Sequence, residues 1–250
     1  MKKSLFHIFL LVLSRPIFSQ DNTTLAKVNP TPSSDQVFVL KNEVQIQNKH
    51  VLALLGNENK PETEKKTNKE FVEMCRKNFP NLEEASKFFA DRGWEYVAEA
   101  ELDTAMHRFE LCNLLNNKNI DAYWGAGVIC FQNGEYDNAS DLLKKGIEID
   151  STNSSIIVDL ATVELACYEK NAHKDDLQAA HNHLAKAIDI DPLNILAWLK
   201  RSESEYYLEN FENAWDCIHS ARLLDITKID LIFVGKLSEK LKDPKNIFKL

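Results

Sequence analysis

Glycine and proline are scarce in this chain of 250 residues, at 7 each. Their scarcity excludes collagen-like and proline-rich stalk structures and argues against a β-sandwich rich in turns. Hydrophobic residues make up 44% and charged residues 27% of the sequence, proportions that argue against global disorder. The chain also lacks an excess of basic residues, because its formal net charge is -8. We therefore expect no binding to nucleic acid.

The short motifs that mark many enzymes are missing as well. The sequence has no GxSxG, HExxH, P-loop or GxGxxG pattern, and its five cysteines form no CxxC pair or zinc-ribbon spacing. Four cysteines lie in apolar helical patterns, where a free thiol packs as a small hydrophobic side chain. A disulfide or a reactive thiol stays an alternative to this burial. We therefore expect no enzymatic activity, no catalytic residue, no bound metal and no cofactor.

The N-terminus has the layout of a secretory signal peptide over residues 1–19. Lys2 and Lys3 precede a short apolar stretch, 5–13, and Ser19 provides a small residue for cleavage. The apolar stretch is too short to cross a bilayer comfortably, since about 20 residues are needed. The sequence therefore predicts an exported chain with no transmembrane segment after cleavage. An uncleaved anchor is the alternative.

Residues 20–69 form a polar or extended segment and linker. Within it, 36–55 are apolar, and the alternation of valine and isoleucine there favours a short strand or an extended strap. Residues 56–69 have the composition of a charged linker.

An N-terminal helix and a connecting loop are expected over 70–85. The helix should run over about 69–78 and end at Phe79-Pro80. Asn81 is placed to cap the next helix, with Glu84 as its capping-box partner.

An internal repeat fills most of the remaining chain. Three of its units contain 34 residues, and the third unit is longer because of seven extra residues near 167–176. The four units are 86–119, 120–153, 154–194 and 195–228.

Aligning the units gives six regular columns. Three columns hold only small residues: Gly93, Gly127, Ala161 and Ser202; Ala105, Ala139, Ala180 and Ala214; and Cys112, Gly146, Ala187 and Ala221. Three hold large apolar residues: Phe89, Tyr123, Ile157 and Trp198; Leu102, Tyr136, Leu177 and Phe211; and Phe109, Leu143, Leu184 and Ile218. The spacing predicts two amphipathic helices in each unit, and such a pair must stack on its neighbours to bury its apolar face.

This pattern resembles the tetratricopeptide repeat family, whose period and three small columns it matches. The second unit is the clearest, with Tyr123, Gly127, Gly134, Tyr136, Ala139 and Gly146. The resemblance implies an all-α fold, a right-handed α-solenoid of about four helix-turn-helix repeats. Residues 229–250 would then supply a capping helix and tail, because Leu231, Val234, Leu237 and Leu241 have helical spacing and Pro244 follows.

A narrower stretch, 85–127, looks like a group of bacterial exported repeat proteins. It includes Gly93-Trp94, Arg108-Phe109 and Tyr123-Trp124-Gly125. This likeness implies export across the inner membrane into a bacterial periplasm.

In the tetratricopeptide repeat family the first helices of the repeats line a concave groove that binds peptides or helices. Transferring those positions implies a largely apolar and aromatic groove, which suits a protein or peptide partner. Residues 36–55 are the obvious internal filler if the groove is not open. The groove positions are Ala90, Trp94, Val97, Trp124, Val128, Phe131, Val158, Thr162, Leu165, Leu199, Glu203 and Tyr206.

Some members of the family grip a C-terminal carboxylate with basic side chains. The matching positions here carry no basic residue, and Asp159 among them would repel a carboxylate. The sequence therefore predicts an adaptor that binds partners of another chemistry.

Two alternatives from other classes remain. The region His173–His183, with Asp175 and Asp176, could serve an enzyme or a metal site, although His181 and His183 diverge on a helix. The groove or the cap could instead mediate a homo-oligomer with a structural role in the envelope.

Overall fold

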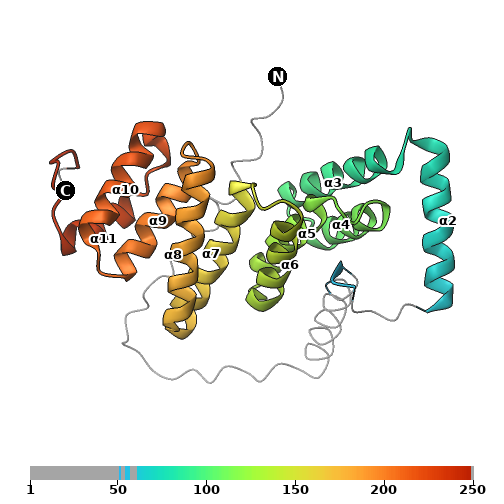
Figure 1. Cartoon of the computed structure of the whole chain (residues 1–250), viewed down its shortest axis with the longest axis horizontal. Coiled ribbons are helices and arrows are strands. Elements are labelled where there is room, and N and C mark those ends of the chain that lie inside the picture. The colour runs from blue at the N-terminus through green and yellow to red at the C-terminus, as the bar shows by residue number, and fades with distance from the viewer. Residues whose placement is uncertain (1–50, 52–53, 57–60, 249–250) are drawn as a thin grey trace, which may run out of the picture.

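The computed structural model describes residue 51, residues 54–56 and residues 61–248, and no strand is present among them (Figure 1). The predicted signal peptide at 1–19 and most of the segment 20–69 lie outside these residues. The elements are α2 (Glu62–Asn78), α3 (Leu82–Ala98), α4 (Leu102–Leu115), α5 (Ile120–Gln132), α6 (Tyr136–Ile149), α7 (Ser154–Asn171), α8 (Lys174–Ile190), α9 (Ile195–Tyr207), α10 (Phe211–Leu224), the 3-10 turn η2 (Ile226–Lys228) and α11 (Leu231–Lys240).

Helices α3 to α10 form four antiparallel pairs that stack one after another along the molecule (Figure 1). Each helix packs most extensively on its partner in the pair, and the second helix of each of the first three pairs packs next on the first helix of the following pair. The predicted all-α solenoid of four helix-turn-helix units is confirmed. None of the described helices is both long enough and apolar enough to span a membrane.

The side chains of neighbouring helices explain why the small columns hold only small residues. A Cβ on Gly93 would lie 2.7 Å from the ring of Phe109, and one on Gly127 would lie 2.8 Å from Leu143. Between units, a Cβ on Gly146 would lie 2.4 Å from Ile156. Large side chains of the neighbouring helices therefore fill the space that the small residues leave open.

The seven extra residues of the third unit lengthen its helices rather than forming a loop. Helix α7 has 18 residues and α8 has 17, whereas α5 and α6 have 13 and 14. Ala172 ends α7 in the left-handed conformation, at φ 55°. Helix α7 therefore continues past the position at which α5 ends in its own pair. Tyr168 and Glu169 lie on this extension of α7.

Helix α2 is longer than predicted, because it begins at Glu62 rather than near 69. The linker prediction is therefore wrong for residues 62–69. Pro61 fixes the backbone before the first turn, Glu62 and Glu64 complement the helix dipole, and Lys65 pairs with Glu62. Cys75 is the buried residue of this otherwise solvated helix, so it gives little hydrophobic periodicity to detect.

The predicted boundary after α2 is confirmed. The helix ends at Asn78, directly before Phe79-Pro80. Asn81 accepts a hydrogen bond of 2.8 Å from the backbone N–H of Glu84 and so caps α3. Helix α3 thus begins at Leu82, four residues before the start assigned to the first unit.

Part of the apolar segment 36–55 lies among the described residues. Val51 and Leu54 are buried in the same hydrophobic core as the repeats, and Leu55 packs against it. Val51 and Leu54 are helical, and the N–H of Leu55 donates to the carbonyl of Val51 at 3.0 Å, so the predicted strand or extended strap is wrong there. Residues 36–50, 52 and 53 lie outside the described residues.

The C-terminal cap is built on α11, which covers Leu231–Lys240 of the predicted capping segment 229–250. Val234 and Leu237 are buried against Trp215 and Ile218, but Leu231 is exposed, so that member of the predicted apolar face is wrong. Phe233 of α11 and Leu241 and Phe248 of the tail pack against the same cluster as partly buried side chains.

The tail is held by Asp243, which lies just after α11. Its carboxylate pairs with His219 at 2.8 Å and accepts hydrogen bonds from the backbone N–H groups of Lys245, Ile247 and Phe248. Burial raises the pKa of Asp243, but these hydrogen bonds outweigh it and bring the pKa to about 2. The cap is therefore closed by a carboxylate that stays ionised at neutral pH.

Candidate functional site

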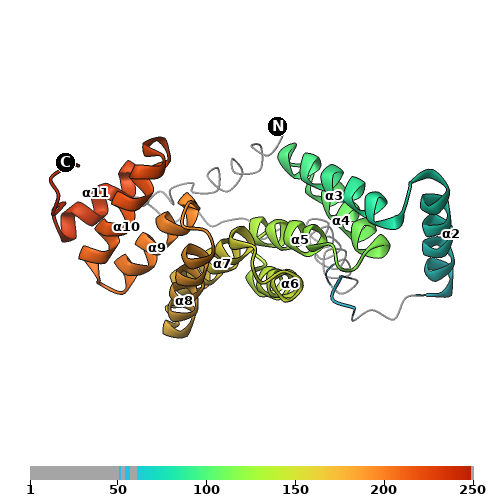
Figure 2. The same ribbon diagram turned by 45° about the horizontal axis from the view of Figure 1, so that its top comes forward.

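The first helices of the pairs lie on the inner side of the curved array (Figure 2). Consecutive first helices contact one another, α3 with α5, α5 with α7 and α7 with α9, whereas consecutive second helices do not do so to a comparable extent in the described part of the chain. Closer spacing on the first-helix side makes that side concave. The groove positions predicted from the sequence all belong to these first helices.

The predicted groove positions differ in how far solvent reaches them. Those that remain partly exposed, and so can touch a partner in this conformation, are Trp94, Trp124, Phe131, Leu199, Glu203 and Tyr206. The others are buried in the packing between helices: Ala90, Val97, Val128, Val158, Thr162 and Leu165. That this surface binds a partner stays a prediction.

Two tryptophans connect the first helices through indole–carboxylate hydrogen bonds. Trp94 on α3 donates from Nε1 to Asp121 on α5, at 3.1 Å. Trp124 on α5 donates from Nε1 to Asp159 on α7, at 2.6 Å. The two indoles meet edge to face, with ring centroids 5.5 Å apart. Each tryptophan is thus oriented by the next repeat, and the pair forms a fixed aromatic surface.

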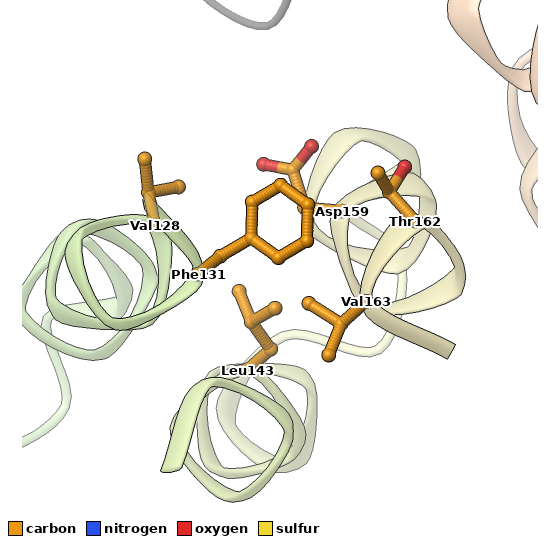
Figure 3. A pocket seen from close by; sticks show the side chains of 6 residues that line it. All are labelled: Val128, Phe131, Leu143, Asp159, Thr162 and Val163. Atoms are coloured by element: carbon orange, nitrogen blue, oxygen red, sulfur yellow. The ribbon is translucent and has the colours of Figure 1, made fainter. Parts of the chain in front are cut away.

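Phe131 lies beside this surface and covers a small hollow between α5, α6 and α7 (Figure 3). The hollow has a cavity volume of about 10 Å³, which accommodates one water-sized group. It is too small for a substrate or drug-sized ligand. The residues that line it are Val128, Phe131, Leu143, Asp159, Thr162 and Val163.

Asp159 is the acidic group of this hollow. Its residue is 7% exposed, and no cation is bonded to it among the described residues. Burial raises its pKa to about 7, although the hydrogen bond from Trp124 acts in the opposite direction. The carboxyl is therefore only partly ionised at neutral pH, and its ionised form has no cationic partner among the described residues.

Asp121 is in a similar position one repeat earlier. Burial raises its pKa, the Trp94 hydrogen bond lowers it, and the nearby charge of Asp91 raises it further. An indole N–H is a neutral donor, so neither tryptophan cancels the charge of the carboxylate it binds. The first three units thus present an acidic and aromatic inner face.

Aromatic side chains continue along the groove towards the C-terminus. Tyr168, on the extension of α7, meets Tyr207 of α9 with centroids 5.3 Å apart, and Tyr207 donates a hydrogen bond to Glu169. Tyr206 packs on Tyr207 and on Phe233 of α11. Tyr168 and Tyr207 are not among the predicted groove positions, and Tyr168 lies in the insertion, where it has no counterpart in the other units.

The five cysteines are free thiols, and Cys167 alone is not fully buried. Burial raises the pKa of Cys112, Cys130 and Cys217 to about 12, and it also raises the pKa of Cys75 and Cys167. A thiol that is protonated at neutral pH is a weak nucleophile. The prediction that these residues pack as small hydrophobic groups is confirmed for the four buried thiols.

The histidines of the region His173–His183 point to different partners. His181 accepts a hydrogen bond of 2.9 Å from Arg201, and His183 pairs with Glu164 at 2.8 Å. Burial and the charge of Arg201 both lower the pKa of His181. The described residues hold no group of three or more His, Cys, Asp or Glu side chains arranged for a metal ion. The expected divergence of His181 and His183 on their helix is confirmed.

No protein-family model and no curated protein sequence matches the chain. Solved structures do resemble it. TTC0263, a thermophilic tetratricopeptide repeat protein of Thermus thermophilus, has a TM-score of 0.52 and 16% identity, over 65% of this chain and 93% of that one. A double mutant of MamA, described as MamA RS-1 ArsTM, has a TM-score of 0.53 and 14% identity, over 64% and 86% of the two chains.

A crystal structure of the MamA protein covers 67% of this chain and 98% of its own, at 17% identity and a TM-score of 0.49. The identities are low, so these likenesses concern the fold. Together with the helix pairs and the small columns facing large side chains, the two matches with the higher TM-scores show that the chain has the fold of a tetratricopeptide repeat solenoid.

Proposed function

We propose that this protein is an exported interaction scaffold that binds a segment of another protein in the concave groove of its repeats. The observation that carries the proposal is the aromatic surface of Trp94 and Trp124, which is fixed by hydrogen bonds between repeats and still partly exposed, as is Phe131. Oriented aromatic side chains lose little conformational entropy on binding and supply much of the energy of interfaces.

Photocrosslinking in cells tests the groove. A photoreactive phenylalanine analogue at Phe131 should capture one dominant protein, and the capture should disappear when Trp124→Ala is added. The same analogue at Lys144, an exposed position on α6, is the matched control and should not give that product. Crosslinks only to residues of the chain's own N-terminal segment would contradict an open groove, and the predicted filler would then be its occupant.

Export to a bacterial periplasm is the second part of the proposal. It is supported by the charged start, the short apolar stretch and Ser19, and by the likeness of residues 85–127 to exported repeat proteins. The purified mature chain should begin at Gln20, as measured by intact mass and N-terminal sequencing. Recovery of a chain that still carries Met1 in the membrane fraction would contradict cleavage and favour an anchor.

A homo-oligomer is a second candidate, favoured by the apolar surface at the C-terminal end of the array. Leu223, Ile226, Leu231 and Ile232 are between 61% and 76% exposed there. If this surface joins two copies, Leu231→Glu should reduce the mass measured by light scattering to that of one 28.6 kDa chain or its mature form. An unchanged mass would count against assembly through the cap.

A further inference from the structure

Charge is distributed unevenly along the sequence. Residues 62–227 carry 17 basic and 31 acidic side chains, whereas residues 228–250 carry six basic and three acidic ones. The second stretch contains α11 and the tail, which form the C-terminal end of the array (Figure 1 and Figure 2). An acidic array therefore ends in a basic cap, a feature that the net charge of -8 conceals.

Most acids near the cap are already engaged. Asp243 is buried and pairs with His219, and Asp216 pairs with Lys245 at 2.9 Å. Asp225 and Asp230 accept backbone hydrogen bonds at the starts of η2 and α11. The basic side chains are less committed. The exposed lysines that form no ion pair among the described residues are Lys236, Lys240 and Lys242.

Large apolar side chains are exposed at the same end of the molecule. Val234 and Leu237 of α11 are buried against α10, so the opposite side of α11 faces solvent. That side carries Ile232, Lys236 and Glu239 at helical spacing. The apolar side chains that are between 61% and 76% exposed here are Leu223, Ile226, Leu231 and Ile232.

These observations define a cap surface in which apolar and basic side chains alternate. Its acid is Glu239, and its apolar members are short aliphatic groups that protrude from α11 and from the turn before it. The residues of the cap surface are Leu223, Ile226, Leu231, Ile232, Lys236 and Lys240.

An anionic lipid bilayer fits this combination. At a membrane interface, apolar side chains enter the acyl boundary while lysines keep their ammonium groups among the headgroups. Each lysine near an anionic leaflet strengthens binding about fivefold. Protruding side chains can enter a fluid layer directly, whereas a folded partner must supply a matching hollow for each of them.

The acidic array does not prevent this contact when the cap meets the bilayer end-on. Neighbouring helices pack about 8–10 Å apart, and charges are screened over about 8 Å at physiological ionic strength. Most acids of α3 to α8 therefore lie beyond the reach of the lipid charge. The array then projects from the membrane.

We propose that the cap surface binds the surface of an anionic lipid bilayer, with Leu231 and Ile232 in the acyl boundary and Lys236 and Lys240 at the headgroups. The inference does not depend on what the groove binds, because it assigns a second interaction surface. A second copy of the chain is the competing occupant. Two copies that met symmetrically through this surface would bring their lysines together, which the like charges oppose.

Sedimentation of the protein recovered after export with lipid vesicles tests the proposal. Vesicles of equal parts phosphatidylglycerol and phosphatidylcholine should bind the protein at least about tenfold more tightly than vesicles of phosphatidylcholine alone. Added salt should weaken this binding. Lys236→Gln combined with Lys240→Gln should weaken it about 20-fold, at about fivefold for each lysine. The matched control is Lys118→Gln combined with Lys144→Gln, at exposed positions outside the cap.

Ile232→Ser tests the apolar part of the surface. It should weaken binding to the anionic vesicles several-fold, because this side chain no longer enters the acyl boundary. Leu193→Ser is the matched control, since Leu193 is 72% exposed at the turn between α8 and α9. It should bind as the wild type does. Both positions are exposed, so circular dichroism should show that both variants fold.

The remaining outcomes would overturn the proposal. Equal binding to both kinds of vesicle, or to neither, would remove the charge preference on which it stands. Binding that the cap variants leave unchanged would place the lipid contact elsewhere. A dimer seen by light scattering without lipid, and dissociated by Ile232→Ser, would make a second copy the occupant. Crosslinking from Phe131 should be unaffected by the cap variants, so the groove proposal is tested separately.

Discussion

The substitution Asp159→Asn should stabilise the folded protein at pH 8 by roughly 2–4 kcal/mol, because each unit of pKa shift corresponds to about 1.4 kcal/mol. The pKa of Asp159 is raised from 3.8 to about 7 by burial, against the effect of the Trp124 hydrogen bond. Between these two values the folded state holds a proton that the unfolded state has released. Raising the pH therefore removes stability from the wild type until the folded carboxyl is also ionised.

Urea denaturation at pH 8 and pH 4.5 measures the effect. The stability gained through Asp159→Asn should shrink to below about 1 kcal/mol at pH 4.5, since the native carboxyl is then protonated and neutral. The asparagine introduced by this substitution can still accept the hydrogen bond from Trp124 through its amide oxygen. The exposed Asp141→Asn should change stability little at either pH. Destabilisation by Asp159→Asn at pH 8 would contradict the prediction.

A residue that lowers the stability of the folded protein at neutral pH is expected to have a role in function. Substitutions that improve stability are common at positions where function needs an unfavourable group. At Asp159 the indole of Trp124 supplies a hydrogen bond but no compensating charge. The stability measurement therefore tests whether burial of this carboxylate weakens the fold.

The repeat architecture could be predicted from the sequence because its packing is periodic. A small residue recurs where a large side chain of a neighbouring helix must fit, as Gly127 does opposite Leu143. The elements that could not be predicted from the sequence are those that do not follow the repeat period. Helix α2 is charged and solvated, and the insertion of the third unit lengthens α7 and α8 where no other unit offers a comparison.

The site could be predicted in part. The positions of Trp94, Trp124 and Phe131 follow from the repeat columns. The sequence alone also predicts that Asp159 would repel the carboxylate of a partner. Its pairing with Trp124 spans 35 residues, and that of Trp94 with Asp121 spans 27. Such contacts depend on how neighbouring units stack, and one sequence does not specify that geometry. The burial of Asp159 beneath the indole of Trp124 is visible only once the stacking is known.

The largest loss of stability is expected from Phe109→Ala, at about 3–5 kcal/mol, the usual range for a phenylalanine removed from a core. Phe109 is fully buried on α4, and its ring fills the space left by Gly93 of α3 and Gly125 of α5. The ring also meets Trp94 edge to face at 5.3 Å. The substitution should therefore loosen one wall of the groove as well as the core.

Gly125→Ala provides the complementary test, because its effect should change sign with the residue at 109. In the wild type the new Cβ would lie 2.0 Å from Cζ of Phe109, so the substitution should cost about 1–3 kcal/mol or more. In Phe109→Ala the same methyl group enters the vacated space, and alanine favours a helix over glycine by about 1 kcal/mol. There Gly125→Ala should be neutral or stabilising.

Denaturant unfolding of the two single variants and the double variant measures this coupling, since residues in contact give non-additive free energies. Gly235→Ala in α11 is the matched control, because nothing lies within 4 Å of its added Cβ. It should stabilise the protein slightly and equally in both backgrounds, through helix propensity alone. If Gly125→Ala costs the same with and without the Phe109 ring, that ring is not what excludes a side chain from position 125. The fit of large side chains into small columns would then need another explanation in the first two repeats.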